Sequence, residues 1–391
     1  MLIQIHGGGF ANRGAQLMLW TALDRLRERL PDARFCVEEL GTTFQERAGY
    51  DLYAIAPRAP YASLRKSQLL FRFGGAFSKL LPKSLLERHG VVRRADVDAL
   101  VDISGYAFGD KWPVKKSASM ASRVASFHRK GKPVVLLPQM FGPFDRPAVA
   151  DAFRPVVRQA NLIYAREQPS LECLEKLNDT GRPLGLAPDI TIFSSPIEPA
   201  APSNERYACL VPNSKMIDQG KGTWDTLFVE RMTAAGKRLE SHGITPRVLI
   251  HDANEQDKAV GLEVLERLGR TADGLLIEPD PRKIKGIISR SVMLVGSRFH
   301  AIVASLSTGR PAIVMGWAHK YEALMSDFGT PEFMHRHDQP ASDLESMIDQ
   351  LADTSRNDEV SQRLADSKRS MKADNDAMWG EVIATLTSRG H

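Results

Sequence analysis

The sequence has few of the features that mark secreted or membrane-spanning proteins. It contains only three cysteines, Cys36, Cys173 and Cys209, and they lie far apart. An odd number of scattered cysteines indicates neither a disulfide framework nor a zinc cluster, and it favours a reducing compartment. No stretch approaches the roughly 18 consecutive apolar residues that a membrane span needs. Because the first residues also lack the basic segment, long apolar run and cleavage site of a signal peptide, we expect a cytoplasmic protein.

A strong excess of charge of one sign is missing as well. The chain has 52 Lys and Arg against 47 Asp and Glu, a net charge of +5. This small excess suits acidic substrates but does not indicate nucleic acid, and no DNA- or RNA-binding motif is present. Hydrophobic residues make up 43% of the chain and charged residues 25%, which is typical of a folded globular protein. The length of 391 residues predicts two domains.

Short apolar runs alternate along the chain with longer amphipathic segments. Strands are predicted at 2–5, 99–103, 133–137, 161–165, 207–211, 247–251, 274–277, 292–295 and 312–315, most of them followed by a predicted helix. This alternation favours an α/β fold with parallel sheets covered by helices on both faces.

A Pro-, Ser- and Ala-rich stretch at 194–203 predicts a linker between two such domains. We therefore expect one strand–helix domain over residues 1–195 and a second over 204–340, facing a cleft into which the carboxyl ends of the strands point. Residues 341–391 are predicted to be helices, and packing back on the first domain is one option for them.

Residues 58–94 interrupt the alternation. They contain nine Lys and Arg but one acidic residue, Glu87, with leucines and phenylalanines interleaved. A basic amphipathic segment is able to lie on an anionic membrane surface. The plainer interpretation is a helical insertion with a solvated basic face. Peripheral membrane contact through 58–94 is therefore one of two open predictions.

The strongest functional signal is the segment Gly-Ser-Arg-Phe-His-Ala-Ile at 296–302. It follows the apolar run 292–295 and opens a short helix. Ser297 is the predicted N-cap, which places Arg298 and His300 in the first helical turn. A helix N-terminus has free N–H groups and a positive end, so it favours phosphate or carboxylate. An arginine and a titratable histidine at that position indicate chemistry on an anion.

Weaker candidates follow other predicted strands. The glycine loop at 7–15 could hold a phosphate on backbone N–H groups, but it matches neither a dinucleotide fingerprint nor a P-loop, and a ligand-free turn is an equal alternative. Gln139 is predicted to point into the cleft, unless its loop is only stiffened by proline. Arg166 favours bidentate binding of an anion, with a structural ion pair to Glu167 as the alternative.

Two aspartates, Asp102 and Asp189, also follow predicted strands, and each is a turn or cap residue by default. No pair of histidines has metal-ligand spacing with an acid nearby, so no metal is predicted.

Taken together and in order, these motifs resemble the polysaccharide pyruvyl transferase family. The matching segments are 7–16, 102–105, 137–144, 164–177, 188–189 and 296–320. The resemblance, which spans about residues 1–330, implies two Rossmann-like domains similar to those of GT-B glycosyltransferases. It implies phosphoenolpyruvate as donor and a sugar, in a glycan or glycolipid precursor, as acceptor. The product would be a pyruvate ketal made during exopolysaccharide or cell-surface glycan biosynthesis, with no cofactor besides the donor substrate.

The resemblance assigns the donor to Arg166, Arg298 and His300, with the backbone of Phe299 beside them. Two arginines suit a donor that carries a carboxylate and a phosphate. Ketal formation needs a proton on the methylene carbon, and histidine is suited to deliver it near neutral pH. We expect the bound dianionic donor itself to keep His300 protonated.

The base that activates the sugar hydroxyl stays open among Asp102, Asp189 and Glu167. The residues expected to line the acceptor side or the cleft are Gly8, Gly9, Asn12, Gln139 and Lys320. Two other functions remain as alternatives: a nucleotide-sugar-dependent GT-B glycosyltransferase, and a non-catalytic protein that binds anions or glycans.

Overall fold

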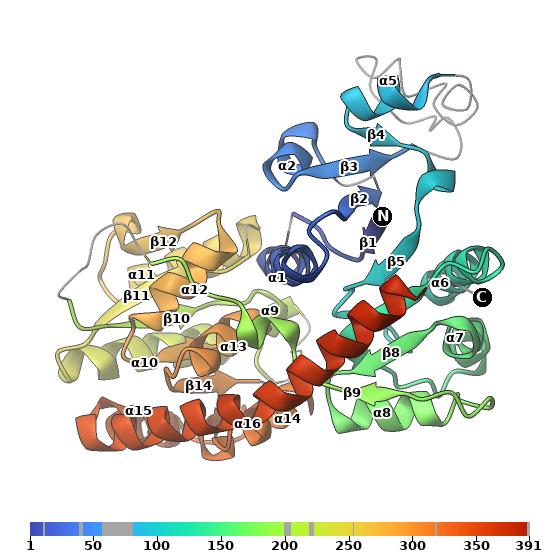
Figure 1. Ribbon diagram of the computed structural model, residues 1–391. Coiled ribbons are helices and arrows are strands. Elements are labelled where there is room, and N and C mark those ends of the chain that lie inside the picture. Colours follow the sequence, from blue (N-terminus) through green and yellow to red (C-terminus); the bar gives the residue numbers. More distant parts are fainter. Residues whose placement is uncertain are drawn as a thin grey trace. The chain divides into compact units, whose positions relative to one another are not determined.

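The computed structural model describes residues 1–10, 12–38, 42–56, 81–198, 205–218, 223–252, 254–316 and 319–388 (Figure 1). The chain packs into two compact units, each built on one sheet. Unit 1 contains Met1–Phe10, Met18–Asp189 and Asp374–His391, and unit 2 contains Ala11–Leu17 and Ile190–Ala373.

Among the described residues, the sheet of unit 1 has nine strands in the order β4-β3-β2-β1-β5-β7-β8-β9, with β6 paired to β7 off this path. Its strands are β1 Leu2–His6, β2 Arg34–Glu38, β3 Leu52–Ile55, β4 Val91–Val92, β5 Ala99–Asp102, β6 Tyr106–Phe108, β7 Val134–Phe141, β8 Leu162–Ala165 and β9 Gly185–Leu186. Its helices are α1 Arg13–Arg29 (whose first turn groups with unit 2), α2 Phe44–Gly49, α5 Lys83–Arg88, η2 Arg94–Asp96, α6 Val114–His128, α7 Pro147–Gln159 and α8 Gln168–Glu175. Every strand pairing is parallel.

In the described part of unit 2, the sheet has six strands in the order β12-β11-β10-β13-β14-β15, again with every pairing parallel. Its strands are β10 Tyr207–Val211, β11 Thr245–Ile250, β12 Leu275–Ile277, β13 Leu294–Gly296, β14 Ala312–Met315 and β15 Met334–His335. Its helices are η3 Ile190–Phe193, α9 Lys215–Asp218, α10 Phe228–Ser241, α11 Glu255–Arg267, η4 Ala272–Gly274, α12 Pro281–Ser289, α13 Phe299–Ser307, α14 His319–Asp327, η5 Pro331–Phe333, α15 Ala341–Ala352 and the longer part of α16 Thr354–Thr387.

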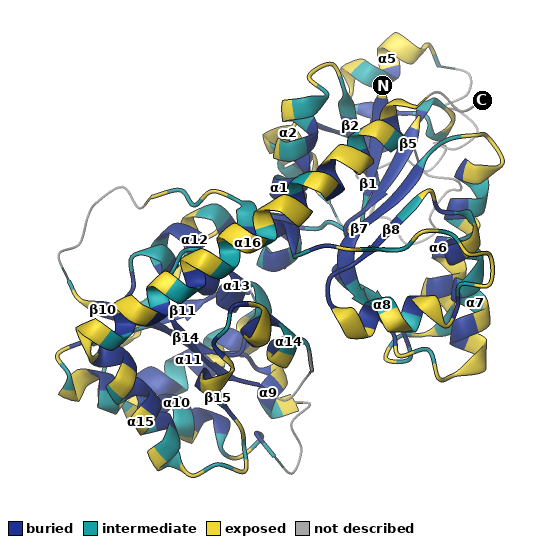
Figure 2. Ribbon diagram, turned by 60° about the horizontal axis from the view of Figure 1, so that its bottom comes forward, coloured by how far each residue is buried: buried dark blue, intermediate teal, exposed yellow. Residues whose placement is uncertain are grey.

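Burial on both faces explains why the central strands were recognisable as apolar runs. Ile3, Leu100, Val135 and Leu210 are fully buried, and Figure 2 shows the central strands in dark blue, with exposed positions concentrated on the helices. Strands sandwiched between helices in a parallel sheet have to be apolar on both sides. The predicted α/β fold with two parallel, helix-covered sheets is confirmed.

The limits of the two units differ from the predicted domain ranges 1–195, 204–340 and 341–391. α15 and residues 354–373 of α16 belong to unit 2, because Leu344, Ile348 and Val360 are buried in its core. Only residues 374–391 of the predicted C-terminal helices belong to unit 1. Residues 11–17, which contain the start of α1, group with unit 2.

Part of the predicted linker lies along α12. The N–H of Ile197 donates to the carbonyl of Arg282 over 3.1 Å, and Nζ of Lys285 donates to Oγ of Ser194 over 3.1 Å. Residues 194–198 are therefore packed on unit 2, whereas 199–204 lie outside the described residues.

The basic segment 58–94 is described only from residue 81 onward. This part forms α5, then β4 at the edge of the unit 1 sheet, then the start of η2. The rest of the segment, residues 58–80, lies outside the described residues, and so does most of the predicted membrane-contacting surface. No helix in the described part of the chain combines the length and apolar character needed to cross a membrane.

Candidate active site

The segment with the strongest sequence signal joins β13 to α13 in unit 2. α13 begins at Phe299, and its N-cap is Arg298 in an extended conformation with φ −86° and ψ 114°, so the predicted N-cap at Ser297 is wrong by one residue. His300 is the second residue of the helix and is half-buried. The carbonyl of Ser297 accepts hydrogen bonds from the Tyr321 hydroxyl (2.7 Å) and from Nδ2 of Asn213 (3.1 Å). These two bonds fix the backbone just before the helix.

Arg298 lies between two carboxylates. One of its terminal nitrogens is 2.6 Å from Oδ2 of Asp252, and the other pairs with Oδ2 of Asp257. Asp257 is fully buried and accepts the N–H of Ser214 on its second oxygen over 2.9 Å. Among the described residues, Nε of Arg298 has no hydrogen-bond partner. The two carboxylates therefore hold the guanidinium in place through its two terminal nitrogens, and its Nε–H makes no hydrogen bond to the described residues.

Asp252 links this cluster to the start of α1. Its Oδ2 accepts a hydrogen bond from Nδ2 of Asn12 over 3.0 Å, and its Oδ1 accepts one from the backbone N–H of Arg13 over 3.3 Å. Asn12 also accepts the N–H of Ala15 over 2.9 Å, as an N-cap side chain does. Burial raises the pKa of Asp252, but His251 and Arg298 outweigh it and hold the pKa well below its usual range. Asp252 is therefore a permanent carboxylate that ties the glycine-loop helix to the arginine.

The first turn of α1 also touches His300. A Cβ atom added to Gly14 would lie 2.1 Å from Nδ1 of His300, so only glycine leaves room for the imidazole at its present position. The imidazole ring lies against this glycine and, at 5.5 Å between ring centres, against Phe299.

A cation lies beside the same turn of α13. Nζ of Lys320 is 5.4 Å from the ring centre of Phe299 and 5.0 Å from that of Tyr321. Burial raises the pKa of Tyr321 to about 12, so its hydroxyl keeps its proton and donates. Unit 2 thus brings together five of the predicted site residues, which are Asn12, Arg298, Phe299, His300 and Lys320.

A second cluster lies at the carboxyl edge of the unit 1 sheet. His6 ends β1 and is in register with Asp102, which ends the neighbouring strand β5. The two side chains meet at 2.6 Å between Nδ1 and Oδ1. Asp102 also accepts from Oγ of Ser104 and from Nε2 of Gln139, each over 2.7 Å. Burial raises the pKa of Asp102, but these bonds and the histidine outweigh it and lower the pKa.

This geometry corrects two predictions. Asp102 is fully buried and saturated with donors, so it cannot itself reach a sugar hydroxyl as a base. Gln139 is also fully buried, and it supports Asp102 instead of facing an open surface. Gln139 thus holds Asp102, and Asp102 in turn holds His6.

Arg166 follows β8 and is surrounded by acids as well. Its Nε is 3.3 Å from Glu167, which is the ion pair kept as the alternative, and a terminal nitrogen is 3.0 Å from Asp189. Asp189 is 2% exposed and Glu167 8%. Both are held by a buried arginine, which argues against either of them as a freely accessible base.

The glycine loop after β1 is shaped by close backbone approach. Gly7 has a φ of +82°, and a Cβ there would lie 2.2 Å from Oγ of Ser104, so only glycine fits. A Cβ on Gly8 would meet the Ile103 side chain at 3.0 Å, whereas nothing lies within 4 Å of one on Gly9. The loop therefore positions His6 and Ser104 and has open space at its tip.

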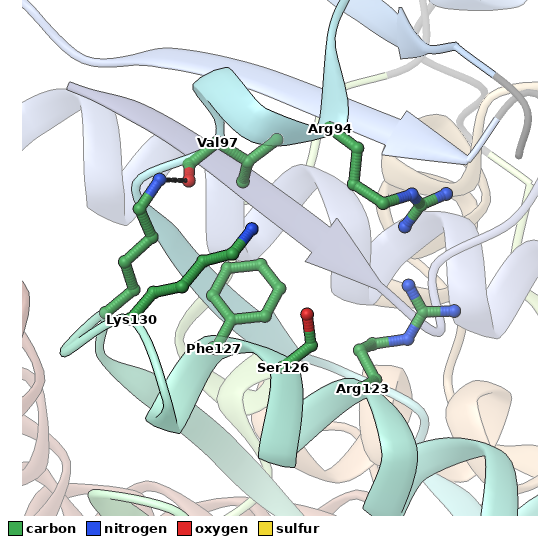
Figure 3. A pocket seen from close by; sticks show the side chains of 7 residues that line it. Arg94, Val97, Arg123, Ser126, Phe127 and Lys130 are labelled. Atoms are coloured by element: carbon green, nitrogen blue, oxygen red, sulfur yellow. Dashed lines mark hydrogen bonds between the residues drawn. The ribbon is translucent and has the colours of Figure 1, made fainter. Parts of the chain in front are cut away.

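A basic pocket lies elsewhere in unit 1, between η2 and α6 (Figure 3). It is lined by Arg94, Val97, Arg123, Ser126, Phe127, Lys130 and Lys132. Glu38 bonds both arginines, at 2.9 Å from Arg94 and 2.6 Å from Arg123, and Lys132 donates to the carbonyl of Val97. The lining includes none of the predicted site residues, and its arginines form a structural ion-pair cluster.

The predicted site residues thus divide between the two units, with Gly8, Gly9, Asp102, Gln139, Arg166 and Asp189 in unit 1. Sequence analysis did not identify His6 or Asp257. His6 could have been singled out as the last residue of a strand before a glycine loop, whereas nothing local marks Asp257. No group of three or more metal-ligating side chains occurs within the described ranges.

Comparisons with known solved structures agree with the fold. Anabaena HepE in complex with UDP-glucose matches with a TM-score of 0.57 and 12% identity over 98% of each chain. UDP-GlcNAc 2-epimerase from Neisseria meningitidis, bound to UDP-GlcNAc, matches with a TM-score of 0.55 and 11% identity over 96% of this chain and 99% of that chain. At such identities the likeness concerns the fold alone, which is that of GT-B-type enzymes with two Rossmann-like halves.

Sequence comparison is more specific. The chain is 22% identical to the amylovoran biosynthesis protein AmsJ of Erwinia amylovora over 272 residues, which cover 64% of this chain and 63% of AmsJ. The match therefore spans less than two thirds of that relative's length. A family model described as polysaccharide pyruvyl transferase matches residues 12–319, which include both α13 and the N-cap of α1. The chain belongs to the polysaccharide pyruvyl transferase family.

Proposed function

We propose that the protein transfers the enolpyruvyl unit of phosphoenolpyruvate to a sugar and forms a pyruvate ketal, in the cytoplasm, during biosynthesis of an exopolysaccharide or cell-surface glycan. Family membership supports the reaction class, and the naming of AmsJ for amylovoran biosynthesis supports the pathway class. The observation that carries the proposal is the placement of a half-buried His300 in the first turn of α13, beside Arg298 and Lys320.

The donor is an anion with a carboxylate and a phosphate, and the β13–α13 junction suits it. The N-terminus of α13 supplies helix N–H groups with a positive end. Lys320 adds a cation beside Phe299. Arg298 has both ends of its guanidinium on carboxylates, so it would serve the donor site mainly by fixing the geometry of this turn. Arg166 is the predicted further donor contact.

The chemistry assigns His300 the role of general acid. Its proton goes to the methylene carbon, which leaves a cation at the neighbouring carbon. A sugar hydroxyl oxygen forms a bond to that carbon, the phosphate leaves with its bonding electrons, and a second hydroxyl closes the ketal ring. The two hydroxyl protons balance those that end on the methyl group and on the phosphate.

Replacing His300 separates catalysis from binding. His300→Ala should lower turnover by about 10²–10⁴-fold, the usual contribution of a general acid, with donor affinity partly retained. Arg166→Ala should lose donor affinity first. Both effects are measured as the rate of phosphate release at varied concentrations of phosphoenolpyruvate. A turnover number equal to that of the wild-type protein in His300→Ala would contradict the role of His300 as the acid.

Ligand-induced stabilisation tests the donor itself. A ligand at 100 times its dissociation constant stabilises the folded protein by about 2.7 kcal/mol, which is a measurable rise in Tm. We expect phosphoenolpyruvate to raise the Tm more than any member of a panel of nucleotide sugars. The opposite order would favour a nucleotide-sugar glycosyltransferase and contradict the proposal.

Peripheral membrane contact through 58–94 remains a separate prediction, checked by co-sedimentation with anionic liposomes.

A further inference from the structure

One histidine in unit 1 is built like a catalytic base. Nδ1 of His6 is 2.6 Å from Oδ1 of Asp102, whose side chain is fully buried. The same carboxylate is anchored by Ser104 and Gln139 at 2.7 Å each. A buried carboxylate is costly unless it is fully hydrogen-bonded, and here every bond serves to keep it ionised next to the imidazole.

The pairing sets the tautomer of the ring. An ionised carboxylate only accepts, so Nδ1 of His6 has to carry the proton. The lone pair is then on Nε2, at the other end of the ring. The His6 side chain is 26% exposed, and within the described ranges Asp102 is the ring's one hydrogen-bond partner. Nε2 is therefore free to accept a proton from a ligand.

The surrounding backbone holds this arrangement in place. The parallel register of β1 and β5 puts the two residues side by side at the carboxyl edge of the sheet, where ligands of α/β folds bind. Gly7, in a left-handed conformation, lets the chain turn directly after His6 and pass against Ser104. The open space at Gly9 lies on the same loop.

We propose that His6 is the general base for the acceptor and that Asp102 is its positioning residue. This inference rests on the proposed function, and the observations behind it all lie within unit 1. The hydroxyl proton of the sugar moves to Nε2 of His6 as the hydroxyl oxygen forms its bond to the donor carbon. The Asp102 carboxylate stabilises the imidazolium that results, and the proton then leaves with the phosphate. Its substrate class is a sugar hydroxyl, so unit 1 is the acceptor side.

Kinetics of His6→Gln are the first test, with phosphoenolpyruvate and a panel of methyl hexopyranosides as acceptors. Turnover should fall by about 10²–10⁴-fold at saturating substrates. The rise in Tm produced by phosphoenolpyruvate should stay unchanged, since the donor is not bound by His6. His128→Gln, at an exposed position that ends α6, is the matched control and should keep wild-type turnover.

The outcomes separate the inference from the proposed function. If wild-type protein releases no phosphate with any acceptor and phosphoenolpyruvate does not raise its Tm, the proposed function fails. If wild-type protein turns over and His6→Gln matches it in kcat, the inference is overturned while the proposed function stands. A change confined to KM would likewise overturn the base role.

The tautomer gives a second readout that does not depend on activity. Nitrogen-15 chemical shifts of the histidine rings should show His6 protonated at Nδ1 in the wild-type protein. Asp102→Asn, which exchanges the carboxylate for an amide, should redistribute that proton and lower turnover with little change in KM. An unchanged His6 tautomer and turnover in Asp102→Asn would refute the role of Asp102.

Discussion

Both arginines predicted to hold the donor are compensated by more than one acid. Arg166 lies between Glu167 and Asp189, and Arg298 lies between two aspartates of its own. A cluster of one guanidinium and two carboxylates is net negative, so neither arginine offers an unopposed charge to an anion. Under the proposed function, attraction of the donor would therefore depend on the N-terminus of α13 and on Lys320, with the arginines acting mainly by fixing geometry.

Gly14 allows a sharp test of the contact between α1 and His300. Gly14→Ala would normally favour a helix by up to about 1 kcal/mol, but here the new methyl group would lie 2.1 Å from Nδ1 of His300. We expect turnover to fall at least tenfold while the Tm changes little, because the imidazole has to move.

The control for this variant is another helical glycine. Gly380 in α16 has nothing within 4 Å of an added Cβ, so Gly380→Ala should keep full turnover and gain slightly in Tm. Equal turnover of Gly14→Ala and wild-type protein would show that the imidazole position does not matter for catalysis.

At the scale of residues, the sequence predicts where a residue lies along a strand or helix better than which side chain it bonds to. It correctly places Arg298 and His300 just beyond a buried strand, since strand ends and helix starts have local signatures. The partner that Asn12 finds in Asp252 is 240 positions away, and no local pattern encodes such a pair. For the same reason Asp102 was predicted as a base, although it proves to be the support of His6.

At the scale of elements, the strands that were missed are those with polar ends or few residues. β2 begins with Arg34 and ends with Glu38, and β4 has two residues, so neither gives a long apolar run. The strands β10 and β14, which are buried at every position, were predicted with their observed limits. β4 is an edge strand but is buried at both of its positions, so the shortness of the run, and not exposure, is what hides it from sequence analysis.

The ion-pair cluster at the end of β2 predicts a pH-dependent contribution to stability. Burial raises the pKa of Glu38, but hydrogen bonds from Arg94 and Arg123 outweigh it and lower the pKa from 4.5 to about 2. The side chain is 30% exposed, so after allowance for solvent screening we expect Glu38→Gln to cost about 2 kcal/mol in the free energy of unfolding at pH 7.

The sign of the pH effect follows from the lowered pKa. The stabilisation is fully present above the unfolded value of 4.5, and it is lost as the pH falls towards the folded value of about 2. Urea unfolding at pH 7 and at pH 3 should therefore show a smaller difference between Glu38→Gln and wild-type protein at the lower pH. Glu28→Gln, at an exposed surface pair, should change stability by less than about 0.5 kcal/mol at both. A difference that grows on acidification would contradict this account.

At the scale of the whole molecule, unit 1 is completed by a distant segment of chain. Residues 374–391 belong to it, and Trp379 and Val382 of this segment are buried. Glu381 accepts a hydrogen bond from the Tyr164 hydroxyl over 2.5 Å. The last turns of α16 are therefore part of the core of unit 1, although all of Ile190–Ala373 separates them from its sheet.

Removing these turns should damage unit 1 selectively. Trp379→Ala is expected to cost about 3–5 kcal/mol, the usual range for a fully buried aromatic side chain, and ending the chain after residue 373 should cost more. Hydrogen exchange followed by mass spectrometry should locate the faster exchange in β7 and β8, with β10 and β13 unchanged. Asp374→Ala, at an exposed position of the same helix, should leave both sheets protected. Faster exchange confined to unit 2 would show that the segment supports the other core.

The interrupted path of unit 1 matters for synthesis on the ribosome. Its first strands emerge early, but the segment that closes it emerges only after every residue of unit 2 has been translated. Throughout that interval the nascent sheet presents uncovered apolar positions to the cytosol, whereas unit 2 lacks no later segment once residue 373 has emerged. Yield in a heterologous host should accordingly depend on chaperone supply and growth temperature, and the late closure of unit 1 would be the step that limits it.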